Sequence, residues 1–269
     1  MLRSSTRLLV SMLALVSAAR MSLHRAAEDA QIEPLKVAIR GRYDAEDDER
    51  KKPDLNAKNK KGQVALHLAV CAQEGTGDPK RMQGATALLD GGANPNAKDG
   101  NDETPLHVIA RACNHLDNGA GSVPMARALA AAKLLLKRSA DADAAGLGDE
   151  VGATPLHVAA AEGHLAIVQL LLGLGKADVN ARDATGATPL MYAARKLRGK
   201  VAHALIKAGA DPQLVDSEGK TARDAVADGK DSFAVAIRGH IDRYRAIRKE
   251  GEEEKKAKAA KAPGAKAEL

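Results

Sequence analysis

The stretch that decides the fold of this 269-residue chain is TPLHVAAAEGHLAIVQLLLGLGKADVNA, residues 154–181. Thr154 can cap a helix and Pro155 suits a first helical turn, so a short helix is predicted to begin here. Its apolar positions form one closely packing face, and Gly163 is predicted to end it. The apolar segment around Leu171 predicts a second, antiparallel helix. The stretch therefore predicts a pair of helices joined by a tight turn.

The same motif recurs along the chain. Its leading residues are Val-Ala-Leu-His at 64–67, Thr-Pro-Leu-His at 104–107 and 154–157, and Thr-Pro-Leu-Met at 188–191. An Asn-Ala pair begins eight residues before three of these copies, at Asn56, Asn96 and Asn180. Similarity repeated with a constant internal order predicts a stack of like units.

The composition and the glycines agree with helical units. With one Phe, three Tyr and no Trp, the core must consist of Ala, Leu, Val and Ile in closely packed helices, which disfavours sandwiches and barrels. The second helices are predicted to end at Gly92, Gly175 and Gly209, because a left-handed turn needs a residue without a Cβ. Short polar turns such as residues 183–186 join the units.

These residues resemble the ankyrin repeat family, whose unit of roughly 33 residues carries the pattern T-P-L-H-x-A-A, an apolar second helix and the ending G-A-D-x-N-A. The resemblance implies an all-α repeat solenoid of helix-turn-helix units joined by β-hairpin-like turns. It covers residues 22–249 as six units, of which the first (22–57) and the last (215–249) are degenerate caps. In the last unit Thr221 remains, while Ala222 and Arg223 replace Pro and Leu.

The second and third units carry long insertions. Successive motif leucines stand 40, 50 and 34 residues apart, at Leu66, Leu106, Leu156 and Leu190. Two interpretations are open. Asp78-Pro79 and Ser122-Val123-Pro124 precede Ala-rich runs, which favours longer second helices. Alternatively, residues 73–79 and 114–122 form neighbouring loops that make a distinctive functional edge.

The segment 1–21 is predicted to be a targeting sequence. It contains no acidic residue, and its apolar run, residues 8–19, is too short to cross a bilayer. The basic start, apolar middle and small residues at 17–19 favour a secretory signal peptide and export. A mitochondrial presequence is the second interpretation, because Arg3, Arg7 and Arg20 share one helical face. A start of translation at Met21, with a cytoplasmic product, is the third.

The carboxyl-terminal segment 250–269 is rich in Ala, Lys and Glu, has no apolar periodicity and is predicted to be flexible. The chain has 41 Lys and Arg against 35 Asp and Glu, a net charge of +6. An alternative function is therefore that of a basic accessory protein, which docks on an anionic membrane or nucleic acid through residues 238–266.

No residue pattern predicts catalysis, a metal or a cofactor. His67, His107 and His157 share one motif position, where the resemblance implies that the ring bridges neighbouring turns. Residues 173–176 look like part of a phosphate loop but are followed by Ala177, where Ser or Thr would hold magnesium. Cys71 and Cys113 fit neither a disulfide framework nor a zinc site. We therefore expect a chain that is not an enzyme.

The resemblance implies a protein-protein interaction module, an adaptor, scaffold or inhibitor, that binds through hairpin tips and the outward positions of first helices. We expect a monomer with a protein partner, no nucleic acid and no transmembrane span in the mature chain. The candidate tip residues are Lys60, Lys61, Asn101, Glu103, Glu150, Thr185 and Glu218. The candidate residues on first helices are Cys71, Arg111, Glu162, Arg195 and Lys196.

Overall fold

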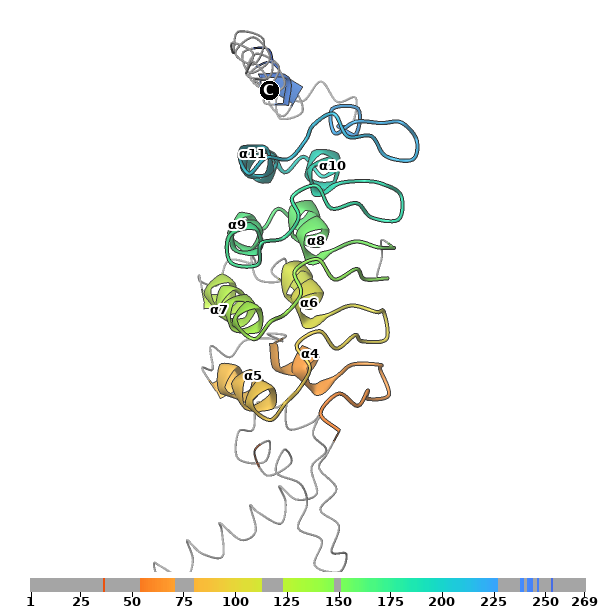
Figure 1. Cartoon of the computed structure of the whole chain (residues 1–269). Helices are drawn as coiled ribbons and strands as arrows, with labels where there is room; N and C mark the ends of the chain where they lie inside the picture. The colour runs from red at the N-terminus through yellow and green to blue at the C-terminus, as the bar shows by residue number, and fades with distance from the viewer. Residues whose placement is uncertain are drawn as a thin grey trace, which may run out of the picture.

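Paired helices stack along one axis in the computed structural model. It describes residues 36, 54–70, 80–112, 123–147, 151–226, 238–239, 241–243, 246 and 253. The first helices of the pairs are α4 (Ala65–Val70), α6 (Pro105–Ala112), α8 (Pro155–Glu162) and α10 (Pro189–Arg195). The second helices are α5 (Lys80–Asp90), α7 (Val123–Lys137), α9 (Leu165–Gly173) and α11 (Gly199–Lys207). Figure 1 shows the two kinds of helix in two parallel rows, with hairpins projecting beyond the first helices. This confirms the helical repeat solenoid.

The motif starts the first helices in the expected way. Thr154 has an extended backbone, with φ −91° and ψ 165°, and Pro155 is the first residue of α8. At the start of α10, the Thr188 hydroxyl accepts the N–H of Met191 at 3.4 Å. Threonine thus satisfies a backbone donor that the helix itself leaves without a partner.

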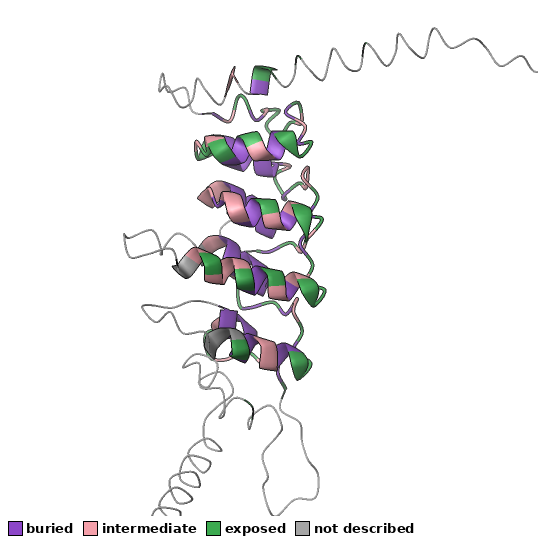
Figure 2. Ribbon diagram, turned by 90° about the vertical axis from the view of Figure 1, so that its left-hand side faces the viewer, coloured by how far each residue is buried: buried purple, intermediate pink, exposed green. Residues whose placement is uncertain are grey.

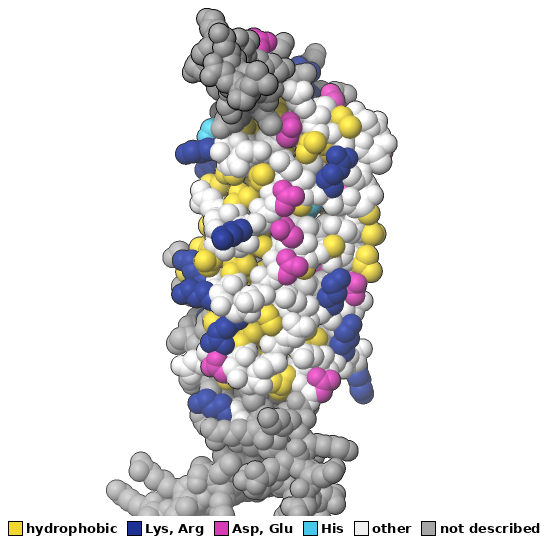
Figure 3. Space-filling model, viewed as in Figure 1, with side chains coloured by type: hydrophobic (Ala, Val, Ile, Leu, Met, Phe, Trp, Pro, Cys, Tyr) yellow, Lys and Arg dark blue, Asp and Glu magenta, His cyan; other side chains and the backbone are white. Residues whose placement is uncertain are grey.

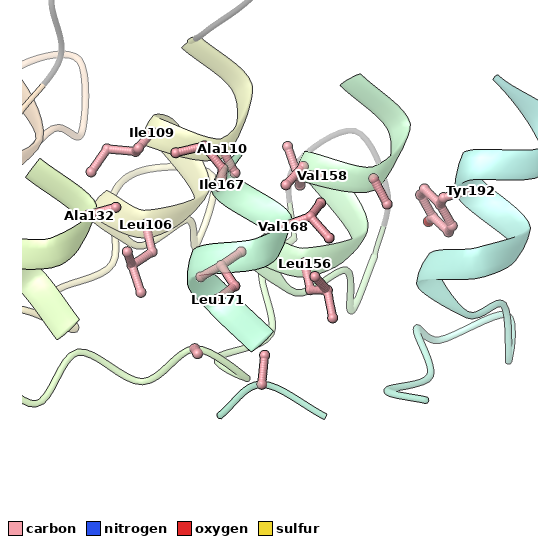
Figure 4. Close-up of a cluster of buried hydrophobic side chains, with 14 of the residues drawn as sticks. Leu106, Ile109, Ala110, Ala132, Leu156, Val158, Ile167, Val168, Leu171 and Tyr192 are labelled. Atoms are coloured by element: carbon pink, nitrogen blue, oxygen red, sulfur yellow. The ribbon is translucent and has the colours of Figure 1, made fainter. Parts of the chain in front are cut away.

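The core is continuous along the stack and is built from small aliphatic side chains. It runs from Leu55 to Ile241, and Figure 4 shows the part between α6 and α10. Neighbouring first helices approach through buried alanines, such as Ala160 of α8 and Ala193 of α10, both 0% exposed. In Figure 2 the buried residues of each second helix lie on the side that faces its neighbours. Close packing by Ala and Leu explains how the core forms almost without aromatic residues.

Two of the three predicted helix-ending glycines have the expected conformation. Gly92 and Gly209 are left-handed, with φ 96° and 101°. The prediction for Gly175 was wrong, because Lys176 takes the left-handed conformation there, with φ 52°. Leu174 remains right-handed after α9, which moves the turn by one residue. Glycine is required at 175 for space, since a Cβ there would lie 2.6 Å from the Leu171 carbonyl oxygen.

Part of the third unit's insertion lengthens a helix and part lengthens a hairpin. Helix α7 has 15 residues, whereas α9 and α11 have 9 each. The hairpin before α8 is closed by a hydrogen bond from the Gly146 N–H to the Ala153 carbonyl at 2.9 Å. It is three residues longer than the hairpin before α10, which the Asp183 N–H and the Ala187 carbonyl close. The candidate loops 73–79 and 114–122 lie outside the described residues.

The end units are described only in part. Most of residues 22–57 and 227–249 lies outside the described ranges, so the division into six units stays a prediction. Thr221 keeps the geometry of the motif: its N–H and hydroxyl donate to the Asp224 carboxylate at 2.9 and 2.6 Å. Asp224 therefore takes the place that histidine has in the central units.

Candidate partner-binding surface

An Asp or Asn side chain holds each regular hairpin. Asp183 Oδ1 accepts the backbone N–H groups of Thr185 and Ala187, both at 2.8 Å. Asn59, Asp99 and Asp216 each accept the corresponding two N–H groups at 2.8–3.0 Å. Burial disfavours the charged form of Asp183, but hydrogen bonds from Tyr192, Thr185 and Ala187 outweigh this and hold its pKa below the ordinary value. The hairpin backbone is therefore fixed by local bonds.

Adjacent hairpins are also bonded to one another at their tips. Each of these bonds joins a backbone N–H to a backbone carbonyl of the preceding tip. The donors and acceptors are Leu147 and Asn101 (3.2 Å), Ala184 and Val151 (3.0 Å), and Ser217 and Thr185 (2.8 Å). The accepting residues all stand three positions before the start of the motif. We call the residues at this position the tip row: Lys61, Asn101, Val151, Thr185 and Glu218. All five are exposed, and each has a different chemical character.

The structure places most of the predicted tip residues at the tips. Lys60, Lys61, Asn101, Thr185 and Glu218 are exposed, whereas Glu150 lies outside the described residues. Sequence reasoning missed Val151, which is 56% exposed and takes the tip-row position in the long hairpin. The constant offset of three residues from the motif would have identified it. Leu147, 55% exposed, has no such signal, because it belongs to the inserted part.

Glu103 was wrongly expected to be an outward tip residue. Its side chain is 6% exposed and forms an ion pair with Arg111 of α6. Arg195 of α10 likewise pairs at 2.9 Å with Asp216, whose side chain is 4% exposed, and it lies over the Tyr192 ring. Both arginines therefore connect a first helix to a buried hairpin carboxylate. Sequence reasoning had identified these positions but not these partners.

The other candidates on first helices differ in accessibility. Lys196 is exposed and Glu162 is half-buried, while Cys71 lies outside the described residues. A role of these residues in binding stays a prediction.

Arg111→Ala is expected to lower the free energy of unfolding by about 1 to 3 kcal/mol, because buried Glu103 loses its guanidinium partner. Urea unfolding of the purified chain measures this difference. Lys196→Ala, at an exposed position, is the matched control and should change stability by less than about 0.5 kcal/mol. Equal stability of the two variants would show that the Arg111 ion pair contributes nothing.

The motif histidines connect neighbouring units, as the resemblance implies. His107 Nδ1 lies 3.2 Å from the Thr104 N–H nitrogen and 2.9 Å from the Thr104 hydroxyl. Since Nδ1 accepts, the proton is on Nε2, which donates to the Ala153 carbonyl at 3.0 Å. Burial lowers the pKa of His107 to about 4, and it also lowers the pKa of His67 and His157. These rings are neutral structural bridges near pH 7.

His67 lacks one of these bonds, because Val64 stands where the other units have Thr. Its Nε2 is 2.9 Å from the Glu103 carbonyl oxygen, but its buried Nδ1 has no hydrogen-bond partner among the described residues. Val64→Thr is therefore expected to raise the free energy of unfolding by about 0.5 to 1.5 kcal/mol. Thermal and urea unfolding check this. Val70→Thr adds the same hydroxyl on α4 away from this ring and should not stabilise; a loss of stability in Val64→Thr would contradict the assignment.

The described residues include neither a candidate metal site nor a helix that could span a membrane. It contains no group of three or more His, Cys, Asp or Glu side chains that could hold a metal ion. Residues 173–176 form the end of α9 and the turn after it. None of the described helices is long and apolar enough to cross a bilayer.

Comparison with known proteins identifies the repeat. The family model for ankyrin repeats (3 copies) matches residues 79–183 and 125–216, which together make up half of the chain. Neurogenic locus notch homolog protein 1 of Xenopus tropicalis is 33% identical over 200 residues, 71% of this chain and 7% of that protein. Neurogenic locus notch homolog protein 4 of Homo sapiens is 37% identical over 176 residues, 62% of this chain and 8% of that protein. The chain spans less than a tenth of the length of these relatives.

Proposed function

Because the chain belongs to the ankyrin repeat family, we propose that it binds a protein partner through the tip row and serves as an adaptor, scaffold or inhibitor without catalysis of its own. The observation that carries this proposal is that the tips have a constant backbone arrangement but different side chains. Hydrogen bonds between hairpins hold these positions in register, while the side chains change from unit to unit. A rigid scaffold with variable side chains is what selective recognition requires.

The chemical order along the tip row indicates what kind of surface would fit it. The row begins with basic Lys61, next to exposed Lys58 and Lys60, and ends with acidic Glu218. Between these ends lies the apolar pair Leu147 and Val151 in the long hairpin. A complementary partner would present an acidic group, an apolar pocket and a basic group in the same order.

The double variant Lys61→Glu with Glu218→Lys tests this order, because it reverses the two ends of the row without changing the net charge. The full chain is used as bait in a lysate of its native host, and retained proteins are quantified by mass spectrometry. We expect the specific partner to be depleted about tenfold or more, the range of an interface hot spot.

Lys207→Gln, on the outward side of α11, is the control and should retain the partner. Retention of the same proteins, in equal amounts, by wild type and by the tip-row double variant would contradict the proposed site. Circular dichroism verifies that both variants are folded.

The alternative function, docking on an anionic membrane or nucleic acid through residues 238–266, stays a prediction. Most of that segment lies outside the described residues. Within the described part, Arg238 donates to the Val226 carbonyl at 3.4 Å and Arg223 pairs with Asp242 at 3.2 Å. These contacts hold basic side chains against the end of the repeat and do not favour the alternative.

We also propose that residues 1–21 direct the chain out of the cytosol, to export in preference to mitochondria. The segment is expected to be removed after Ala19 if it is secretory, or near Met21 if it is mitochondrial. Intact-mass measurement of the protein from its native host distinguishes the two. A mature chain that retains Met1 would contradict both, and a chain that begins at Met21 without import would indicate internal initiation.

A further inference from the structure

Three of the four described second helices, α5, α7 and α11, contain more basic than acidic residues. Helices α5, α7, α9 and α11 together contain seven Lys and Arg but one acidic residue, Asp90. This excess is as large as the net charge of the whole chain, +6. Asp90 is itself engaged by Arg138 at 2.6 Å. Helices α5, α7 and α11 therefore carry a net positive charge, whereas α9 contains no charged residue.

The burial pattern places the lysines of α7 and α11 on the side that faces away from the core. In α7, Lys133 and Lys137 are exposed, one helical turn apart, whereas Ala131 and Leu135 are fully buried. Lys200 and Lys207 of α11 are exposed in the same way. Figure 3 shows Lys and Arg side chains in a row along the side where the second helices lie.

Apolar side chains lie among these cations. Leu136 and Leu172 are half-buried, and Leu174, directly after α9, is 47% exposed. Figure 3 shows hydrophobic side chains between the basic ones along the second helices. We call this surface the second-helix face, defined by Lys133, Lys137, Arg138, Lys176, Lys200, Lys207, Leu136, Leu172 and Leu174.

Acidic residues follow a different face. Asp141, Asp143, Asp178 and Asp211 stand in the loops that leave the second helices, where Figure 3 shows a row of acidic side chains. Asp143 accepts the Asp178 N–H of the next loop at 2.9 Å, and the intervening Asn side chains accept in the same way. The carboxylates of Asp141, Asp178 and Asp211 each accept a backbone N–H two residues on in their own loop. These carboxylates keep their negative charge, but they stand in the loops and not on the second helices.

We infer that the second-helix face docks on the surface of an anionic lipid membrane. Lysine and arginine side chains attract anionic headgroups, and their long aliphatic stems lie along apolar surface. Exposed leucines among the cations can enter the boundary between headgroups and acyl chains. This surface is separate from the tip row, so the protein can lie on a membrane and hold a partner at the same time.

The same observations disfavour two other occupants. A second copy of the chain would bring two like-charged faces together. Nucleic acid would be attracted by the cations, but the exposed Leu174 contributes nothing to phosphate contacts, and the described second helices contain no Phe, Tyr or Trp for base stacking. An anionic lipid surface uses both the charges and the leucines.

The test is cosedimentation of the full chain with phosphatidylcholine vesicles that contain phosphatidylserine at about one lipid in three. Wild type is expected to bind these vesicles and to be released by added salt. The double variant Lys133→Gln with Lys137→Gln should bind at least about tenfold more weakly. The matched control, Lys60→Gln with Lys61→Gln, removes the same charge from exposed hairpin positions and should bind as wild type does. Vesicles of phosphatidylcholine alone report any contribution of the apolar segment 8–19.

Each other outcome overturns the inference. Equal weakening by the two double variants would mean that net charge alone governs binding. Failure of wild type to bind the anionic vesicles would contradict the inference directly. If Leu174→Ser leaves vesicle binding unchanged and duplex DNA is bound through Lys133 and Lys137, the face would instead belong to another polyanion. The tip-row double variant should still bind vesicles, so failure of this inference is distinguishable from failure of the proposed partner site.

Discussion

Replacement of Leu171 with alanine is expected to lower the free energy of unfolding by about 2 to 5 kcal/mol. Leu171 of α9 is 1% exposed and belongs to the continuous core, where Figure 4 shows it together with Leu106 and Leu156. Truncation leaves a cavity that the closely packed neighbours can fill only in part. Urea unfolding, monitored by circular dichroism, measures the loss.

Leu174→Ala is the matched control, because it removes the same atoms from a leucine that is 47% exposed only three residues away. It is expected to change stability by less than about 1 kcal/mol. A repeat stack can unfold in stages. The two variants are therefore compared only if the free energy of unfolding falls with urea concentration at the same slope as in wild type. If Leu171→Ala costs no more than Leu174→Ala, the register of α9 against its neighbours is wrong.

Acid is expected to destabilise the repeat through its buried histidines, with His107 alone contributing about 3 kcal/mol. Its folded pKa is about 4, below the ordinary value of 6.5, because burial disfavours the charged ring. Between these values the unfolded chain binds a proton that the folded chain does not. Stability is therefore complete above pH 6.5 and falls as the pH decreases toward 4. Urea unfolding at a series of pH values measures this slope.

His107→Gln should be less stable at pH 7.5 but should lose less stability between pH 6.5 and 4 than wild type does. His203→Gln, at an exposed position of α11, is the control and should keep the wild-type slope. The carboxylate of Asp183 does not confuse the comparison, because its pKa lies below the ordinary value and its contribution is lost at lower pH. Identical slopes for wild type and His107→Gln would contradict the neutral bridge.

The repeat could be predicted from the sequence because its determinants are local and recur. Thr154 starts a helix through its own backbone geometry, Pro155 has a suitable fixed φ, and the apolar spacing sets the buried side of α8. The tip-row positions follow from the same recurrence, through a constant offset from the motif. Targeting, partner identity and the candidate loops 73–79 and 114–122 stay predictions.

Tertiary structure alone decided which of these side chains remain accessible. Sequence position placed Glu103 with the exposed tips, yet Arg111, one helix further along the chain, draws its carboxylate into a buried ion pair. Val151 takes the tip-row position that its offset from the motif predicts, whereas the exposure of Leu147 follows from the longer hairpin that Gly146 and Ala153 close. The exposed lysines of α7 and α11 likewise share one side of the molecule only because the second helices are stacked in one row. Helix starts depend on neighbours within one turn, whereas burial and ion pairing depend on side chains that the folding of a whole unit and the stacking of units bring together.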